Sequence, residues 1–233
     1  RLSTAQIAGV STTTMAALST TQLAAISTKD IAALSTAQLS AVSTTNLAAL
    51  STAQITAMTT AQVGALAANM STTQIGALTT AQTAGLTTTV ISSLATAQLQ
   101  AISTKDIAAL STTQAAGLST TVLGNLTAAQ LKAIETKDIA AMSTTQLGAL
   151  TTTQVGTLAT AQIAALSSTQ IGSLGAKLST RQITALTTTQ VAGVSTTTMA
   201  ALSTAQLVAI STKDIAALST TQLGSLGTAA VAA

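Results

Sequence analysis

Aliphatic and polar positions alternate along this chain in a pattern that repeats every eight residues. Residues 3–34 read STAQIAGV, STTTMAAL, STTQLAAI and STKDIAAL. The unit is Ser or Thr, Thr, any residue, Gln, an aliphatic residue, two small residues and a second aliphatic residue. It occurs 27 times, and position 8 is aliphatic in all 27 copies. Position 5 is aliphatic in 25 copies, the exceptions being Thr83 and Ala115.

An eight-residue period excludes one continuous α-helix as the carrier of this pattern. Eight residues rotate a helix by about 800°, so an apolar stripe would drift by about 80° per octad. The aliphatic positions would soon wind around the whole helix surface. The chain must therefore break once in every repeat.

The residues of each octad indicate where the break lies. In STTQLAAI, Ser19 followed three residues later by Gln22 is a capping box, in which each side chain bonds the other residue's backbone N–H. Leu18 before the cap and Leu23 form the hydrophobic staple that accompanies such a helix start. Position 1 is Ser or Thr in 24 octads, and position 4 is Gln in 18 and Asp in four more. The pattern predicts an all-α repeat solenoid of very short capped helices, one per octad.

A β-solenoid with one short strand per octad is the competing interpretation, since Ser/Thr-rich repeats and aliphatic ladders also fit it. Positions 5 and 8 would then point to opposite faces of a strand. Alanine, which is common at positions 6 and 7, is a poor strand residue and a good helix residue. The sequence therefore favours helices, with the β-solenoid as the alternative.

Two four-residue insertions interrupt the octads, AANM at 67–70 and GAKL at 175–178. Four residues lengthen a helix by about one turn and keep the same face inward. We therefore expect longer helices at roughly 60–70 and 168–178.

A second, longer period runs through the chain, because the two insertions occupy the same place in two successive blocks of octads. We interpret residues 1–233 as a single repeat array. It contains two super-repeats, 3–110 and 111–218, and a C-terminal end, 219–233. Such a nested period indicates duplication of a larger block.

Four octads carry a Lys-Asp pair at positions 3 and 4, and each closes a block of four octads. The pairs are Lys29 with Asp30, Lys105 with Asp106, Lys137 with Asp138 and Lys213 with Asp214. Adjacent residues do not face each other on a helix, so each Lys would have to pair with the Asp of another repeat. We expect either solvated surface charges or ion pairs that set the register of stacked coils or of neighbouring subunits.

Composition excludes several classes of function. The chain has 233 residues, a net charge of +3 and no His, Cys, Pro or aromatic residue. The basic residues outside the Lys-Asp pairs, Arg1, Lys132, Lys177 and Arg181, are scattered, whereas nucleic-acid binding needs clustered cations and usually aromatics. No apolar run is long enough to span a bilayer, so we expect no membrane insertion. No residue pattern predicts a catalytic, metal or cofactor site, so we expect no enzyme and no cofactor.

The octads STTQLAAI, STKDIAAL and TTAQVGAL resemble the low-complexity Ser/Thr/Ala/Gln repeat regions of very large secreted or cell-surface proteins of Gram-negative bacteria, some of them adhesin-like. The resemblance covers almost the whole chain. It implies an extracellular, structural role and transfers no functional residue.

The first functional hypothesis is a self-assembling fibre, sheath or cell-surface filament whose partners are copies of the same chain. A lone octad buries too little apolar surface to fold, so stacking on neighbours is obligatory. The alternatives are a rigid stalk or spacer in a giant adhesin, and a Thr-rich surface that binds ice or polysaccharide. Thr occupies position 2 in 25 octads.

Overall fold

The computed structural model describes residues 3–226, which form 27 short α-helices and two 3₁₀-helices and contain no strand. Each octad forms one helix of four to seven residues. The helices begin at position 2 of the octad, and where the helix runs to position 7 the aliphatic residue at position 8 has an extended backbone, as at Leu34 with φ −68° and ψ 144°. The all-α solenoid is confirmed for the described residues, and the β-solenoid is wrong.

The chain divides into two compact units, the first ending at Leu110 and the second beginning at Ser111. This boundary falls where the sequence passes from the first super-repeat to the second. The helices of the first unit are α1 (Thr4–Ala8), α2 (Thr12–Ala17), α3 (Thr20–Ala24), α4 (Thr28–Ala33), α5 (Thr36–Ser40), α6 (Thr44–Ala48), α7 (Thr52–Ala57), α8 (Thr60–Leu66), η1 (Ala67–Asn69), α9 (Thr72–Gly76), α10 (Thr80–Ala84), α11 (Thr88–Ser93), α12 (Thr96–Ala101) and α13 (Thr104–Ala108).

The second unit repeats the same succession of helices with its own 3₁₀-helix. Its helices are α14 (Thr112–Gly117), α15 (Thr120–Asn125), α16 (Ala128–Ala133), α17 (Thr136–Ala140), α18 (Thr144–Gly148), α19 (Thr152–Thr157), α20 (Thr160–Ala164), α21 (Ser168–Leu174), η2 (Gly175–Lys177), α22 (Thr180–Thr184), α23 (Thr188–Ala192), α24 (Thr196–Ala200), α25 (Thr204–Val208), α26 (Thr212–Ile215) and α27 (Thr220–Ser225).

Capping boxes begin most of the helices. At α3 the Ser19 hydroxyl accepts from the Gln22 backbone N–H at 3.2 Å, and the Ser19 N–H donates to Gln22 Oε1 at 2.9 Å. The N-cap residues Ala95, Glu135 and Ala159 have the same extended backbone but accept no side-chain cap bond. Backbone geometry is therefore set by the whole repeat, and a single missing hydroxyl does not change it.

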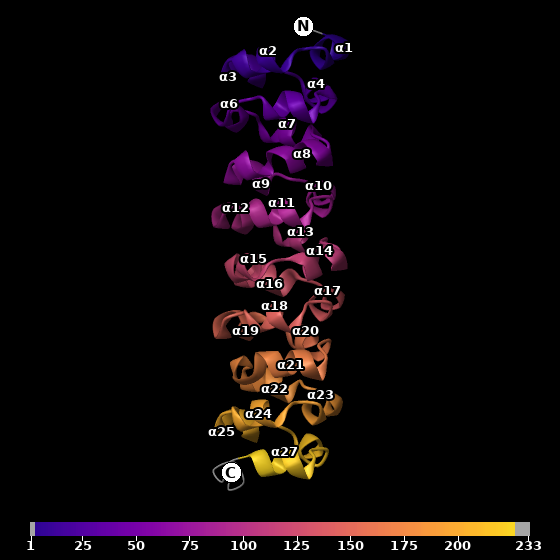
Figure 1. Cartoon of the computed structure of the whole chain (residues 1–233), viewed down its shortest axis with the longest axis vertical. Coiled ribbons are helices and arrows are strands. Elements are labelled where there is room, and N and C mark those ends of the chain that lie inside the picture. The colour runs from indigo at the N-terminus through magenta and orange to yellow at the C-terminus, as the bar shows by residue number, and fades with distance from the viewer. Residues whose placement is uncertain (1–2, 227–233) are drawn as a thin grey trace. The chain divides into compact units, whose positions relative to one another are not determined.

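Within each unit, helices pack on the helix three positions later, counting η1 and η2 as positions, so three helical positions make one coil. In the first unit α1 packs on α4, α4 on α7, and α2 on α5. In the second unit α14 packs on α17, and α18 on α21. Figure 1 shows these coils within each unit as successive groups of short helices. The number of octads per coil, which the sequence leaves open, is thus three.

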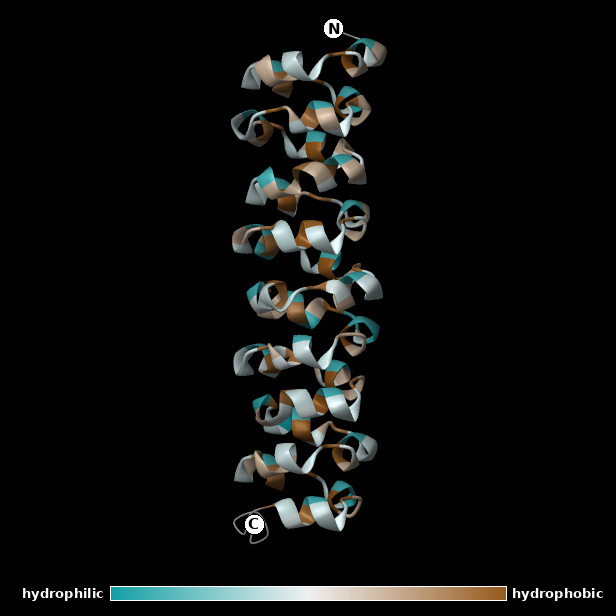
Figure 2. Cartoon of the chain, viewed as in Figure 1, coloured by the Kyte–Doolittle hydropathy of each residue, from teal (hydrophilic) through white to brown (hydrophobic). Residues whose placement is uncertain are grey.

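The core of each coil consists of the aliphatic residues at positions 5 and 8. Met15, Leu23 and Ile31 at position 5 are completely buried, and Leu34 at position 8 is 3% exposed. In Figure 2 hydrophobic and hydrophilic segments alternate accordingly along each helix and its connection. Burying one such side chain stabilises the fold by roughly 1.5–3 kcal/mol, so the aliphatic pair of each octad supports the stacking.

The two insertions lengthen the helical segments at the predicted places, but as an α-helix followed by a 3₁₀-helix instead of one continuous α-helix. α8 and α21 have seven residues each and run on into η1 and η2. The backbone turns at the junctions, because Leu66 has φ −111° and Gly175 has φ +47°. Each insertion then packs as an extra position in the coil: η1 lies on α11, and η2 lies on α19 and α24.

Most glycines are not required by close packing. A Cβ at Gly124 would meet nothing within 4 Å, whereas a Cβ at Gly193 would lie 2.4 Å from Ser168 Cβ. Gly193 therefore sits where two stacked helices come too close for any side chain. Gly85, its counterpart in the first super-repeat, is equally constrained by Thr60, whose Cγ2 would lie at 2.2 Å.

We expect Gly193→Ala to destabilise the second unit by about 1–3 kcal/mol, because overpacking forces the backbone apart. The matched control is Gly124→Ala, which we expect to be neutral or to stabilise by up to about 1 kcal/mol through helix propensity. Urea unfolding of both variants measures the difference. Equal stabilities would contradict the close contact.

Candidate functional site

The polar contacts that join successive coils are the chemically most distinctive feature of the molecule. They come from position 4 of the octads, where Gln side chains are buried. Gln62 is 2% exposed, and its Nε2 donates to Ile31 O at 3.0 Å and to Leu34 O at 2.5 Å. Its Oε1 accepts from the Thr59 N–H at 2.7 Å. One amide therefore caps the start of its own helix and the end of a helix one coil away.

The same contact recurs in both units, between residues that lie roughly one coil apart in the sequence. In the second unit Gln162 Nε2 donates to Leu131 O and Ile134 O, at 3.0 and 2.7 Å. Short helices leave most of their last carbonyl groups without intrahelical partners, and an unpaired buried carbonyl is costly. The Gln ladder satisfies those carbonyls and fixes the register of the coils.

The insertions take part in this ladder as half-octads. Gln98 Nε2 donates to Ala67 O and Met70 O of the first insertion, at 3.0 and 2.6 Å. In the second insertion Lys177 Nζ donates to Gly148 O at 2.5 Å and to Leu150 O at 2.8 Å. Lys177 thus does with an ammonium group what Gln does elsewhere with an amide.

The Asp residues of the Lys-Asp octads make a different contact between coils. Asp106 Oδ1 accepts from the Thr80 hydroxyl at 2.7 Å, and its Oδ2 accepts from the Ser103 hydroxyl at 2.5 Å. A carboxylate has no hydrogen to give to a carbonyl, so it accepts from the Thr that begins a helix of the adjacent coil. The same spacing between donor and acceptor recurs in all four cases, and the hydroxyl donors are Thr4, Thr80, Thr112 and Thr188.

This contact gives the four-octad blocks of the sequence a physical meaning. In the block 111–142, Asp138 in the last octad accepts from Thr112 in the first octad at 2.6 Å. Because three octads make one coil, the fourth octad lies on the first. Each block is therefore one coil plus the helix that locks onto its start.

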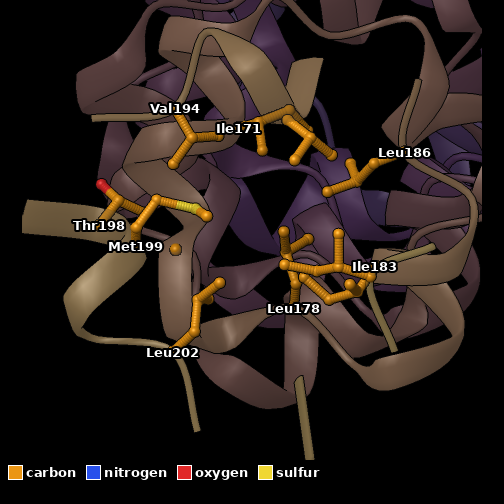
Figure 3. A pocket seen from close by; sticks show the side chains of 11 residues that line it. Ile171, Leu178, Ile183, Leu186, Val194, Thr198, Met199 and Leu202 are labelled. Atoms are coloured by element: carbon orange, nitrogen blue, oxygen red, sulfur yellow. The ribbon is translucent and has the colours of Figure 1, made fainter. Parts of the chain in front are cut away.

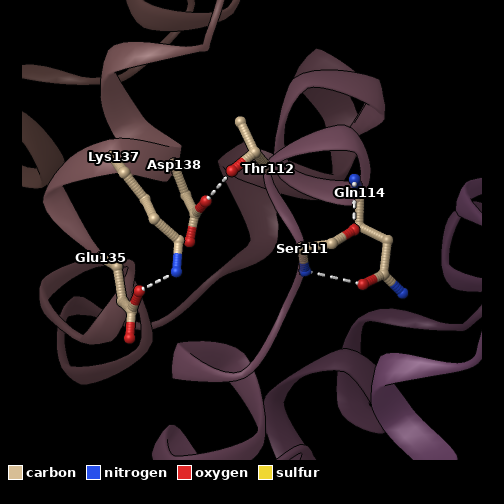
Figure 4. A network of polar contacts seen from close by, with 6 residues as sticks. All are labelled: Ser111, Thr112, Gln114, Glu135, Lys137 and Asp138. Carbon is tan, nitrogen blue, oxygen red and sulfur yellow. Dashed lines mark hydrogen bonds and ion pairs between the residues drawn. The ribbon is translucent and has the colours of Figure 1, made fainter.

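The Lys residues of these octads do not pair with the Asp residues of other repeats in the described part of either unit. The ion pair that the structure describes within residues 3–226 joins Lys137 to Glu135 of the same octad (Figure 4). The hydrogen bond and the charge of Glu135 raise the pKa of Lys137 above its usual value. Register-setting ion pairs between neighbouring subunits remain a prediction.

The interior holds a small void in the second unit, between α21, η2 and the helices stacked on them (Figure 3). Its volume is about 20 Å³, and its lining is apolar, including Ile171, Ile183 and Met199. The apolar lining offers a water molecule no hydrogen-bond partner. It is a gap left by a core without aromatic side chains, too small for a ligand.

We expect Gln82→Met to destabilise the first unit by about 1–3 kcal/mol more than Gln22→Met. Gln82 Nε2 donates to Ile55 O and Met58 O, at 2.9 and 2.8 Å, and these buried carbonyls would lose their partner. Gln22 is exposed and makes only the capping-box bonds. Subtracting one variant from the other isolates the contact between coils. Hydrogen exchange at Ile55 and Met58 measures it locally, and equal protection in both variants would argue against the ladder.

The stability contributed by Asp214 should depend on acid pH. The hydroxyls of Ser211 and Thr188 donate to this carboxylate and, helped by the charge of Lys213 and opposed by burial, lower its pKa below the usual value. A lowered pKa in the folded state means that the contribution is complete above about pH 4 and is lost as the pH falls through the folded-state pKa.

Asp214→Asn is the matched variant, since an amide oxygen can still accept from Thr188 but does not titrate. We expect the variant to be less stable than the wild type at pH 7, with the gap closing as the pH approaches about 2. Urea midpoints against pH measure it. Because Asp and Glu together number 5, the background titration is small. A gap that is constant with pH would contradict the assignment.

Comparison with known proteins identifies the octads as repeats of a described type. A family model described as the ALTTAQ repeat matches residues 31–68, 131–168 and 146–176. These matches lie in both super-repeats and cover less than half of the chain. No curated protein matches the sequence. No helix within residues 3–226 is long and apolar enough to cross a membrane, and no group of side chains there could hold a metal ion. The chain is a repeat protein whose octads, in these stretches, match the ALTTAQ repeat.

Proposed function

We propose that the chain is a structural protein that assembles, copy on copy, into a secreted fibre, sheath or cell-surface filament. The observation that carries the proposal is the uniformity of the contact between coils. Successive coils present equivalent backbone carbonyls, which accept hydrogen bonds from the Gln amides of the next coil. The contact that joins two coils within a unit can therefore also join a coil to one of another copy.

In the coil formed by α1, α2 and α3, residues 3–226 cover this contact surface only in part. Val10, Leu18 and Ile26 at position 8 are half-buried there, whereas position 8 is buried in most of the coils that follow. Together with Ile7, Met15 and Gln22 they line a groove of about 260 Å³. Within the first unit, equivalent surfaces are covered by the preceding coil of octads. A coil from a second copy has the matching shape and chemistry.

The last described coil has two exposed aliphatic side chains. Leu223 is 40% exposed and Val208 63%, although the aliphatic residues of the repeats are otherwise largely buried. Exposed apolar surface and terminal carbonyls favour association with a surface of the same repeat. A small net charge of +3 repels other copies only weakly.

The test is electron microscopy of the purified chain at micromolar concentration and moderate salt. We expect regular filaments in the wild type and in Thr13→Glu, which places a charge on an exposed position of α2 outside the groove. Leu18→Glu places the same charge in the groove and should abolish filaments while leaving the coils folded by circular dichroism. Lys29→Ala combined with Lys137→Ala should change the salt dependence of assembly if those residues pair between subunits.

Discrete short particles in the wild type at all concentrations would overturn self-assembly. That outcome would support the second role, a rigid stalk or spacer, because the ladder of Gln contacts would then serve only to hold the coils of one chain in register. Filaments that form equally well from Leu18→Glu would place the subunit contact elsewhere on the molecule.

A further inference from the structure

The structure brings together two basic residues that lie far apart in the sequence. Lys132 in α16 and Arg181 in α22 line one groove of about 170 Å³ in the second unit. Both side chains are exposed, and neither takes part in an ion pair within residues 3–226. No acidic residue lines the groove. Two uncompensated cations in one hollow create a locally positive potential.

The floor of the groove is polar, and its side-chain amide is held by hydrogen bonds. Gln182 is 2% exposed, and its Nε2 donates to Val155 O at 2.7 Å and to Leu158 O at 2.9 Å. Ser179 bonds the same amide through its N–H at 3.0 Å. These bonds belong to the ladder that holds the coils together, so the groove has rigid walls. Rigid walls reduce the ordering cost of binding.

The super-repeat supplies an internal comparison, because each position of the groove has a counterpart in the first copy of the block. Lys132 corresponds to Ala24, and Arg181 corresponds to Thr73. Ala159, which also lines the groove, corresponds to Ser51.

The two cations therefore occur in only one of the two copies of the block, and the copies also differ at many other positions. The N-cap backbone is the same with Ala as with Ser, since Ala159 and Ser51 have nearly equal φ angles, −67° and −69°. Lys132 and Arg181 make the groove cationic, whereas their counterparts Ala24 and Thr73 carry no charge.

We propose that this groove binds an oxyanion, a sulfate or carboxylate group carried by an acidic polysaccharide. The guanidinium of Arg181 can present two parallel N–H donors to such a group, and the ammonium of Lys132 supplies a second charge. The open space above Gly156, where a Cβ would meet nothing within 4 Å, leaves room for the sugar that carries it. The proposal does not depend on filament formation.

The experiment is calorimetric titration of the full chain with a sulfated tetrasaccharide, with the unsulfated sugar of the same length, and with sodium sulfate. We expect binding of the sulfated sugar and none of the neutral sugar. Lys132→Ala and Arg181→Thr should each weaken binding about tenfold, through loss of one charge-assisted contact. Lys105→Ala, an exposed lysine of the first unit, removes the same charge and should change the affinity less than about twofold.

A variant that gains a binding site tests the proposal without relying on variants that lose binding. The quadruple variant Ala24→Lys, Ala48→Gly, Ser51→Ala and Thr73→Arg places the corresponding residues in the first unit and should raise the number of sites from one to two. If sodium sulfate binds as tightly as the sulfated sugar, the ligand of the groove is the free ion. That result would overturn the proposal that the ligand is a polysaccharide. Binding that falls equally in Lys105→Ala, or that persists in Arg181→Thr, would overturn the proposal.

Discussion

The structure depends on one constraint, the need to satisfy the backbone carbonyls of helices that are too short to satisfy their own. A helix of five or six residues makes one or two internal bonds and leaves nearly all its remaining polar groups exposed at its two ends. In water such a helix is unstable, because nucleation costs more than the few bonds return. The Gln at position 4 pairs groups at both kinds of helix end. Its Oε1 accepts from a backbone N–H at the start of its own helix, and its Nε2 donates to carbonyls at the end of another helix. The same Gln side chain therefore caps its own helix and holds two coils together.

The exceptions at position 4 show which part of the Gln side chain does which task. Asn46 Nδ2 donates to Leu18 O at 2.5 Å but makes no capping box, because its shorter side chain cannot reach both ends. The Asp carboxylate has no hydrogen to donate, so it accepts from the hydroxyl of its own N-cap Ser and from the hydroxyl of a Thr in the adjacent coil. Lys177 only donates, and it occurs in a half-octad that has no N-cap to serve. Asn46, the Asp residues and Lys177 each keep one contact between coils, whereas Val90 and Val122 at position 4 have no side-chain group that could make one.

Sequence reasoning identified the part of this design that is local. The spacing of Ser19 and Gln22 and the staple of Leu18 on Leu23 involve neighbours in the sequence, and they predicted the all-α class and the start of each helix. The three octads per coil, and the carbonyls that receive Gln62, involve residues a whole coil apart, which no local spacing encodes. The longer helical segments at the insertions were predicted in place and length, but not the change from α-helix to 3₁₀-helix after Leu66 and Leu174, which counting helix turns cannot reveal. The Asp contacts were invisible for the same reason, since their partners also lie one coil away.

A repeat protein separates positions that maintain the array from positions that are free to vary, and this separation locates function. Positions 1, 4, 5 and 8 are occupied by caps, ladder amides and core aliphatics, and the array tolerates few residue types there. Positions 3 and 6 are mostly exposed, so a charge such as Arg181 or Lys132 at these positions costs the fold little. Charged residues are scarce in this chain, at 6% of all residues. Where two such charges from different coils meet over one hollow, the packing of the repeat does not account for them, and a ligand of opposite charge does.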